Sequence, residues 1–427
     1  MPINVERHRL VALFPAFTGA PVHAVDERAR VLALLAPTSP AERDARLAAR
    51  VLRLVADRTS GEGAVMGGDG WAAAVRRLLP AIDGDAEEGR HLGTIVSALL
   101  TEAPPAVTML RSALHGYADW LEESGRFEEA LSVVSMLLAL PSYAAAPADI
   151  TGKAVQVARL RMALGEWTAA ATALAVAERC ACATGIRADH VRVELLKVRR
   201  LRLRGDAVAA RDGLDRIGAI PGEVRAEMLL ERSAVAMEQF QTAEAAEAAY
   251  RALGAATSDA QRAQALLVLG RTLRTGDAPL EAEQVLRLVP ELAVGVVARA
   301  DAIAELLDVT AIRGDRLQFE RWWREARAFA DALTPALVVR LTYRAAIGYA
   351  RFRRLARART LLFQALQVAQ LGMLFDWMRS IELAVKELHD VPDCSPDVSE
   401  PPVFTPAFLR QVSRAVMAYT DAQRASA

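Results

Sequence analysis

The sequence is poor in cysteine, lysine and asparagine. Its three cysteines, Cys180, Cys182 and Cys394, cannot supply a disulfide framework for 427 residues, so we expect a reducing compartment. Lysine occurs three times and asparagine once, so arginine carries nearly all the positive charge. The 52 basic residues balance 52 acidic ones, which excludes a global attraction to nucleic acid or to an anionic membrane. A charged partner must therefore recognise a local patch.

Long hydrophobic runs are also missing. No stretch approaches the roughly 18 uncharged apolar residues that a membrane-spanning helix requires. Near the start of the chain, Glu6 precedes a short apolar run that Pro15 interrupts, so the match to a secretion signal is weak. We therefore expect a cytoplasmic protein without a membrane partner.

Residues that favour β-strands are scarce. Aromatic residues are 5% of the chain, whereas Ala, Leu, Arg and Glu, which favour helices, recur throughout. Hydrophobic residues make up 53% of the sequence, which is enough to bury a large core. Composition thus predicts a nearly all-α protein.

The patterns of common active sites and metal sites are absent. The six histidines include no i, i+4 pair, and there is no G-x-S-x-G motif. The glycine-rich stretch at 59–70 lacks the Gly-Lys-Ser/Thr ending of a phosphate-binding loop. Cys180 and Cys182 would diverge by about 200° on a helix, so they cannot share one metal ion. We predict that the protein is not an enzyme and holds neither metal nor cofactor.

An internal repeat organises most of the chain. "GRFEEA" at 125, "GEWTAA" at 165 and "GDAVAA" at 205 recur at intervals of 40 residues. Weaker copies are "EQFQTA" at 238, "GDAPLEA" at 276, "GDRLQF" at 314 and "RRLARA" at 353. The seven units have a mean period of 38 residues, and each combines two amphipathic helical patterns.

The residues that end and separate the two helical patterns of the first unit predict a helical hairpin. Gly125 can end the first helix in a left-handed conformation, which costs other residues about 1 kcal/mol or more. Phe127 fills the wedge between the helices, Ala130 lets their backbones approach, and Pro141 stops the second helix. One hairpin cannot cover its own apolar faces, so three or more must stack.

This pattern resembles the tetratricopeptide-repeat family, whose unit is a helical hairpin of about 34 residues. The residues that match the family's signature best are Leu114, Tyr117, Ala118, Leu121, Gly125, Phe127, Ala130 and Leu137. The resemblance extends from about Pro105 to Leu388, although the period is longer and the tryptophan of the family's first helix is missing. It implies an all-α fold in which hairpins stack into an α-α superhelix.

The repeat also suggests a domain organisation. We expect a helical region at 1–104, either a cap or degenerate repeats, which includes a glycine-rich linker at 59–70. The repeat array then occupies 105–390. A proline-rich linker at 391–406 and a last helix at 407–427 complete the chain.

Arginine recurs where the resemblance places the concave groove. In that family the position six residues before the turn residue points into the groove, and three consecutive units have arginine there. Three further arginines lie one heptad or one turn away on the same helices. The six residues of this predicted basic strip are Arg159, Arg192, Arg199, Arg202, Arg225 and Arg232. The strip could bind carboxylates or a phosphate of an extended partner. Alternatively, its arginines face solvent or pair with Glu194, Glu227 and Glu231.

A second concentration of arginine runs from Arg313 to Arg359. It holds twelve arginines against four acidic residues, a local balance of +8. One helix face in this segment combines cationic, aromatic and apolar side chains, namely Arg340, Tyr343, Arg344, Ile347 and Arg351. Such a face suits an acidic, hydrophobic peptide and, less well, single-stranded nucleic acid. The alternative is ion pairing between units, with Asp301, Glu305 and Asp308.

These features favour a non-catalytic scaffold or adaptor that binds a protein or an extended peptide along an arginine-bearing groove. Asparagine, which clamps the ligand backbone in peptide-binding members of the family, is missing from this row. The alternative is a sensor protein of a bacterial transcription or signalling system, with a DNA-reading module within 1–104 or on another chain. The sequence sets no oligomeric state.

Overall fold

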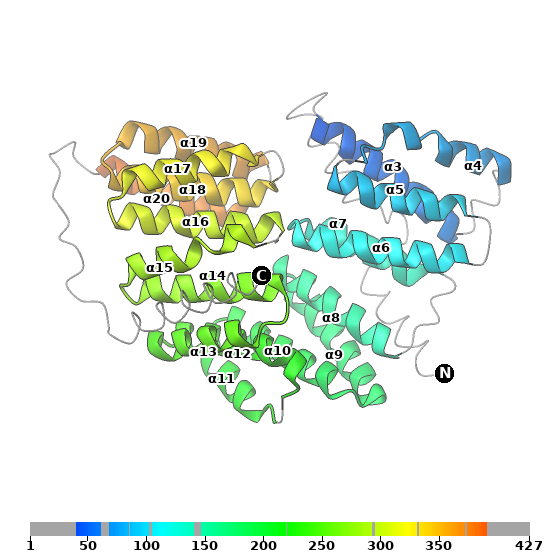
Figure 1. The fold of residues 1–427 in the computed structure, drawn as a ribbon, viewed down its shortest axis with the longest axis horizontal. Coiled ribbons are helices and arrows are strands. Elements are labelled where there is room, and N and C mark those ends of the chain that lie inside the picture. The colour runs from blue at the N-terminus through cyan, green and yellow to red at the C-terminus, as the bar shows by residue number, and fades with distance from the viewer. Residues whose placement is uncertain are drawn as a thin grey trace, which may run out of the picture. The chain divides into compact units, whose positions relative to one another are not determined.

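The computed structural model describes residues 40–60, 68–84, 86–101, 105–140, 147–218, 220–292, 295–330, 333–371 and 374–390. In these ranges the regular structure consists of 18 α-helices and short 3-10 turns, with no β-strand (Figure 1). The all-α class predicted from composition is therefore confirmed. The linker at 391–406 and the last helix at 407–427 lie outside the described residues, as does Pro141.

The chain divides into two compact units, Met1–Leu196 and Lys197–Ala427. The first unit contains α3 (Pro40–Ser60), α4 (Gly68–Arg76), η3 (Leu79–Ala81), α5 (Glu87–Leu100), α6 (Pro105–Glu123), α7 (Phe127–Ala139), α8 (Pro147–Ala163) and α9 (Trp167–Thr184). Helices α6 and α7 pack as one hairpin, and α8 and α9 as the next. Helix α5 packs on α6, so helices before residue 105 share a compact unit with the first hairpins. The predicted linker at 59–70 overlaps helices at both ends, because α3 ends at Ser60 and α4 begins at Gly68.

The second unit continues the series of hairpins. Helix α10 (Arg187–Leu203) contains the boundary between the units. It is followed by α11 (Ala207–Arg216), η4 (Gly222–Val224), α12 (Arg225–Glu238), α13 (Thr242–Ala255), α14 (Asp259–Thr275), α15 (Pro279–Leu286), η5 (Val289–Glu291), α16 (Val296–Ile312), α17 (Arg316–Ala328), α18 (Pro335–Arg351), α19 (Leu355–Leu371) and α20 (Phe375–Asp390). We call the even-numbered helices from α6 to α18 the first helices of the seven hairpins. The odd-numbered helices from α7 to α19 are their second helices.

Every one of the seven hairpin turns contains a residue in the left-handed conformation. These turn residues, with φ between 56° and 86°, are Gly125, Gly165, Gly205, Phe240, Asp277, Gly314 and Arg353. The next residue donates its N–H to a carbonyl five positions earlier, as Arg126 does to Leu121 at 2.8 Å and Arg354 to Tyr349 at 2.9 Å. This is the Schellman arrangement that satisfies the last carbonyls of a helix. The repeat is therefore a backbone motif as well as a sequence motif.

The turn residues correct two of the sequence alignments. The fourth unit, aligned on residue 238, turns at Phe240, and the fifth, aligned on residue 276, turns at Asp277. Phenylalanine and aspartate replace glycine there, although a left-handed backbone is unfavourable for a residue with a Cβ. The sequence therefore contains no glycine at the position where the fourth chain reversal occurs.

The position five residues after each turn residue is fully buried. Six of these residues are alanines, and the sixth hairpin has Phe319 instead, all at 0% exposure; the alanines are Ala130, Ala170, Ala210, Ala245, Ala282 and Ala358. A small side chain here lets the second helix approach the first closely. The role assigned to Ala130 from the sequence thus applies to six of the seven hairpins.

Phe319 is accommodated by a glycine in the following hairpin. A Cβ added to Gly348 of α18 would lie 2.2 Å from Cε2 of the Phe319 ring. The same ring packs edge-on against Tyr349 and Phe352, with centroids 5.0 and 5.2 Å away. The large residue of one hairpin thus requires the smallest residue on the next.

We predict that Gly348→Ala destabilises the protein. The added methyl group collides with the Phe319 ring, and overpacking of this kind costs about 1–3 kcal/mol, which outweighs the gain of about 1 kcal/mol from replacing glycine in a helix. Urea unfolding measures the difference. The matched control is Gly254→Ala in α13, where an added Cβ meets no atom within 4 Å. We expect the control to be stabilising, and stabilisation by both variants would contradict the packing described here.

Candidate functional site

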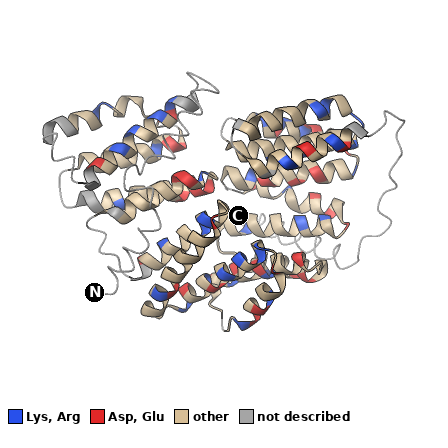
Figure 2. Ribbon diagram, turned by 180° about the vertical axis from the view of Figure 1, so that it is seen from behind, with Lys and Arg blue, Asp and Glu red and all other residues tan. Residues whose placement is uncertain are grey.

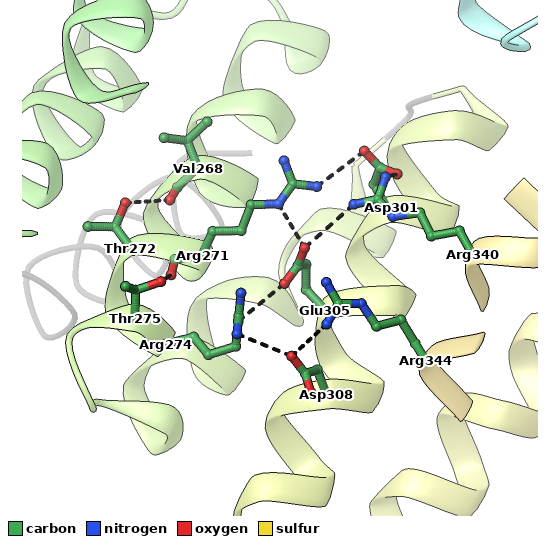
Figure 3. A network of polar contacts seen from close by, with 10 residues as sticks. All are labelled: Val268, Arg271, Thr272, Arg274, Thr275, Asp301, Glu305, Asp308, Arg340 and Arg344. Carbon is green, nitrogen blue, oxygen red and sulfur yellow. Dashed lines mark hydrogen bonds and ion pairs between the residues drawn. The ribbon is translucent and has the colours of Figure 1, made fainter. Parts of the chain in front are cut away.

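Helix α16 presents a row of three carboxylates between two arginine-bearing helices (Figure 3). Asp301, Glu305 and Asp308 are spaced i, i+4 and i+7, so they share one face of α16. Arginines reach this row from α14 on one side and from α18 on the other. We call the resulting set the α16 charge cluster; its members are Arg271, Arg274, Asp301, Glu305, Asp308, Arg340, Arg344 and Arg351.

The contacts from α14 involve two arginines. Arg271 lies 2.9 Å from Glu305 and 3.3 Å from Asp301. Arg274 lies 3.4 Å from Glu305 and 3.2 Å from Asp308. Each of these two arginines therefore bridges two carboxylates one helical turn apart.

The contacts from α18 complete the cluster. Arg340 pairs with Asp301 and approaches Glu305 at 3.6 Å. Arg344 donates a hydrogen bond to Asp308 at 3.0 Å, and Arg351 lies 3.7 Å from the same carboxylate. Each carboxylate is shared by two or three arginines, which joins the fifth, sixth and seventh hairpins.

The acidic and basic side chains of the cluster differ in exposure to solvent. The side chains of Asp301, Glu305 and Asp308 are 18%, 3% and 5% exposed, whereas those of the five arginines are 25–42% exposed. Five cations face three anions, so the cluster carries a net charge of +2. Solvent therefore meets mainly guanidinium groups.

The ionisation of Glu305 follows from its neighbours. Burial acts to raise the pKa of its carboxyl, but Arg271, Arg274 and Arg344 outweigh burial and hold the pKa below its ordinary value of 4.5. Glu305 is thus a carboxylate at neutral pH, and its charge fixes the arginines around it.

The third and fourth hairpins contain a smaller arrangement of the same kind. Arg199 and Arg202 of α10 both bind Glu231 of α12, at 2.9 and 2.7 Å. The Glu231 side chain is 2% exposed. In the first unit, Arg159 of α8 pairs with Glu122 of α6. Pairing between successive first helices is thus a recurrent feature of the described residues.

The other arginines of the predicted basic strip have different surroundings. Arg192 lies 3.5 Å from Asp189 on its own helix. Arg225 is exposed and makes no ion pair with the residues that the structure describes. Arg232 donates a hydrogen bond to Glu244 at 3.2 Å, so it contacts α13, the second helix of its own hairpin. Arg199 instead contacts α12, the first helix of the next hairpin.

The position of Arg232 follows from the corrected turn. With Phe240 as the turn residue, Arg232 stands eight residues before the turn instead of six, and two residues rotate a helical side chain by about 200°. In the fifth hairpin the turn residue is Asp277 and not Gly276, so the residue six positions before the turn is Arg271 and not Gly270. The sequence reasoning therefore missed Arg271. Either residue of the Gly276-Asp277 pair could have been the turn residue, and choosing Asp277 would have identified Arg271.

Tyr343 lies beside the α16 charge cluster. Its ring packs edge-on against Trp377 of α20, with centroids 5.7 Å apart. Burial raises the pKa of its hydroxyl, so Tyr343 is neutral at physiological pH. It supplies an aromatic surface next to the arginines of α18.

The described residues hold no group of three or more His, Cys, Asp or Glu side chains that could bind a metal ion. Cys180 is buried and Cys182 is exposed, as expected for side chains that diverge on one helix. None of the described helices combines the length and apolar character needed to cross a bilayer.

We predict that Glu305→Gln lowers stability by about 2–4 kcal/mol at pH 7, because it leaves arginines on both sides of α16 without their shared anion. The pKa of Glu305 is lowered by folding, so its contribution is complete above the unfolded value of 4.5 and is lost as the pH falls through the folded value. Urea unfolding at pH 7 and below pH 4 should show the difference from wild type shrinking in acid. Glu325→Gln, which removes an exposed pair with Arg299, is the control and should cost less than about 1 kcal/mol. An equal cost for both variants would contradict the cluster's role.

No protein-family model matches the sequence, and no curated protein matches it. Among solved structures, the chain is similar to the TPR domain of P58(IPK), with 12% sequence identity and a TM-score of 0.21. The match covers 80% of this chain and 99% of that one. The hairpin architecture described above rests on the helix order, the turns and the contacts of this chain itself.

Proposed function

We propose that the protein is a non-catalytic helical-repeat scaffold that binds an acidic, extended segment of another protein along the first helices of the hairpins in its second unit. The α16 charge cluster is the principal contact. The observation that supports this most strongly is five partly exposed arginines held over the buried carboxylates of Glu305 and Asp308 and the half-buried carboxylate of Asp301. Helical-repeat proteins generally use such extended faces to bind other proteins.

The arginines of the cluster keep unused hydrogen-bond donors. A guanidinium group has five N–H donors, yet Arg344 gives one hydrogen bond to the protein and Arg351 makes one contact at 3.7 Å. Charge-assisted hydrogen bonds to a partner's carboxylates are stronger than neutral ones. The internal ion pairs therefore leave binding capacity and also hold the arginines in place, which reduces the entropy lost on binding.

The charge balance also favours an acidic partner. Basic and acidic residues are interspersed on the helices of the second unit (Figure 2), so the whole unit does not attract anions uniformly. The attraction is local, where the acidic members of the α16 charge cluster are less exposed than the basic members. Tyr343 and the half-buried Ile347, beside Arg344 on α18, add apolar area. The preferred segment is therefore acidic with interspersed apolar residues.

We predict that Arg344→Gln/Arg351→Gln weakens binding of a fluorescent peptide of alternating Glu and Leu at least tenfold, or about 1.4 kcal/mol. Fluorescence anisotropy at several salt concentrations measures the affinity and its salt dependence. The matched control is Arg316→Gln/Arg324→Gln, because both residues are exposed on α17 and form no ion pair with described residues. Equal affinities of wild type and Arg344→Gln/Arg351→Gln would contradict the proposal, as would an equal loss in the control. Thermal unfolding of each variant checks that the fold is intact.

A further inference from the structure

A cavity of about 380 Å³ lies between α11, α12 and α13, away from the α16 charge cluster. Its lining consists of Arg211, Leu229, Arg232, Glu244, Glu247, Ala248 and Arg251. Three arginines from three different helices thus surround it, against two glutamates that both come from α13. The volume falls within the range of small-molecule sites in proteins, about 300–1,000 Å³.

One of the three arginines, Arg211, is hydrogen-bonded to side chains beside the cavity. Arg211 donates hydrogen bonds to both oxygens of Glu244, at 3.0 and 3.1 Å, and to the side chains of Gln239 and Gln241 at 3.1 and 2.6 Å. Burial acts to raise the pKa of Glu244, but hydrogen bonds from Arg211 and Arg232 outweigh it and lower the pKa. Arg211 and Glu244 therefore form a fixed ion pair on one side.

The other two arginines have donors to spare. Arg232 uses only Nε toward Glu244, so both of its terminal nitrogens are without a hydrogen-bond partner among the described residues. Arg251 has a single contact, with Glu247 at 3.9 Å, beyond hydrogen-bond distance. Their side chains are 45% and 56% exposed, so both can reach a ligand without unfolding any part of the chain.

We propose that this cavity binds a small free anion, a molecule with a carboxylate or phosphate group and a compact body. Arg232 and Arg251 bind the anionic group through their unused N–H donors. The body packs on Leu229 and Ala248, the apolar residues of the lining. The three arginines and two glutamates of the lining carry a net charge of +1, which attracts one negative charge. Arg is well suited to planar or tetrahedral oxyanions because its donors form a fork. The proposal is independent of peptide binding at the α16 charge cluster.

Isothermal titration calorimetry with inorganic phosphate and, separately, succinate at constant ionic strength tests this site in the full chain. Wild type should bind one of the two probes, and the probe that binds distinguishes a phosphate site from a carboxylate site. Arg232→Gln/Arg251→Gln should weaken that binding at least tenfold. The matched control, Arg324→Gln on α17, removes an exposed arginine outside the cavity and should leave the affinity within about twofold of wild type.

A second variant keeps the test independent of folding defects. Glu247→Gln removes the carboxylate beside Arg251 and raises the net charge of the cavity, so anion affinity should increase about three- to tenfold. A damaged fold does not produce tighter binding. The proposal is overturned if neither probe binds wild type, if Arg232→Gln/Arg251→Gln binds as wild type does, or if Glu247→Gln does not bind more tightly.

Discussion

The left-handed residue in each hairpin turn is the constraint on which the rest of the structure depends. It ends the first helix, reverses the chain, and fixes the position at which the second helix begins. Once this residue is placed, the residue five positions later is buried, and it is alanine in six hairpins and Phe319 in the other. Every other position of the hairpin is then assigned to the core, to a neighbouring hairpin or to solvent. A turn displaced by two residues changes all of these assignments, as Arg232 shows.

Stacking of the first helices creates a second constraint, because it buries carboxylates between hairpins. An isolated buried carboxylate is strongly unfavourable, and a cation from a neighbouring helix offsets its desolvation. Arginine suits this role because its planar group contacts more than one carboxylate, as Arg271 and Arg274 do. The same contacts hold the hairpins together and place guanidinium groups at the surface. The proposed partner binding therefore uses the same residues that stabilise the stack.

The candidate site was predictable in part. Helical spacing alone grouped Arg340, Arg344 and Arg351 on one face, and it offered the α16 carboxylates as their alternative partners. The structure has those ion pairs, and it adds Arg271 and Arg274 from the opposite side. Those two were missed because the fifth repeat was aligned one residue early. The α11–α13 cavity had no sequence signal, because its three arginines come from three helices and two hairpins.

The sequence by itself determined the helices, the number of hairpins and the turns at Gly125, Gly165, Gly205 and Gly314, since amphipathic periodicity and glycine are local properties of the chain. The tertiary structure alone decided which charges are buried and which arginines keep unused donors. Arg340 and Asp301, for example, are 39 residues apart and meet only because α16 and α18 pack together. Which face a charged side chain occupies depends on the turn register, and a residue such as Phe240 adopts the left-handed conformation only because the surrounding helices impose it.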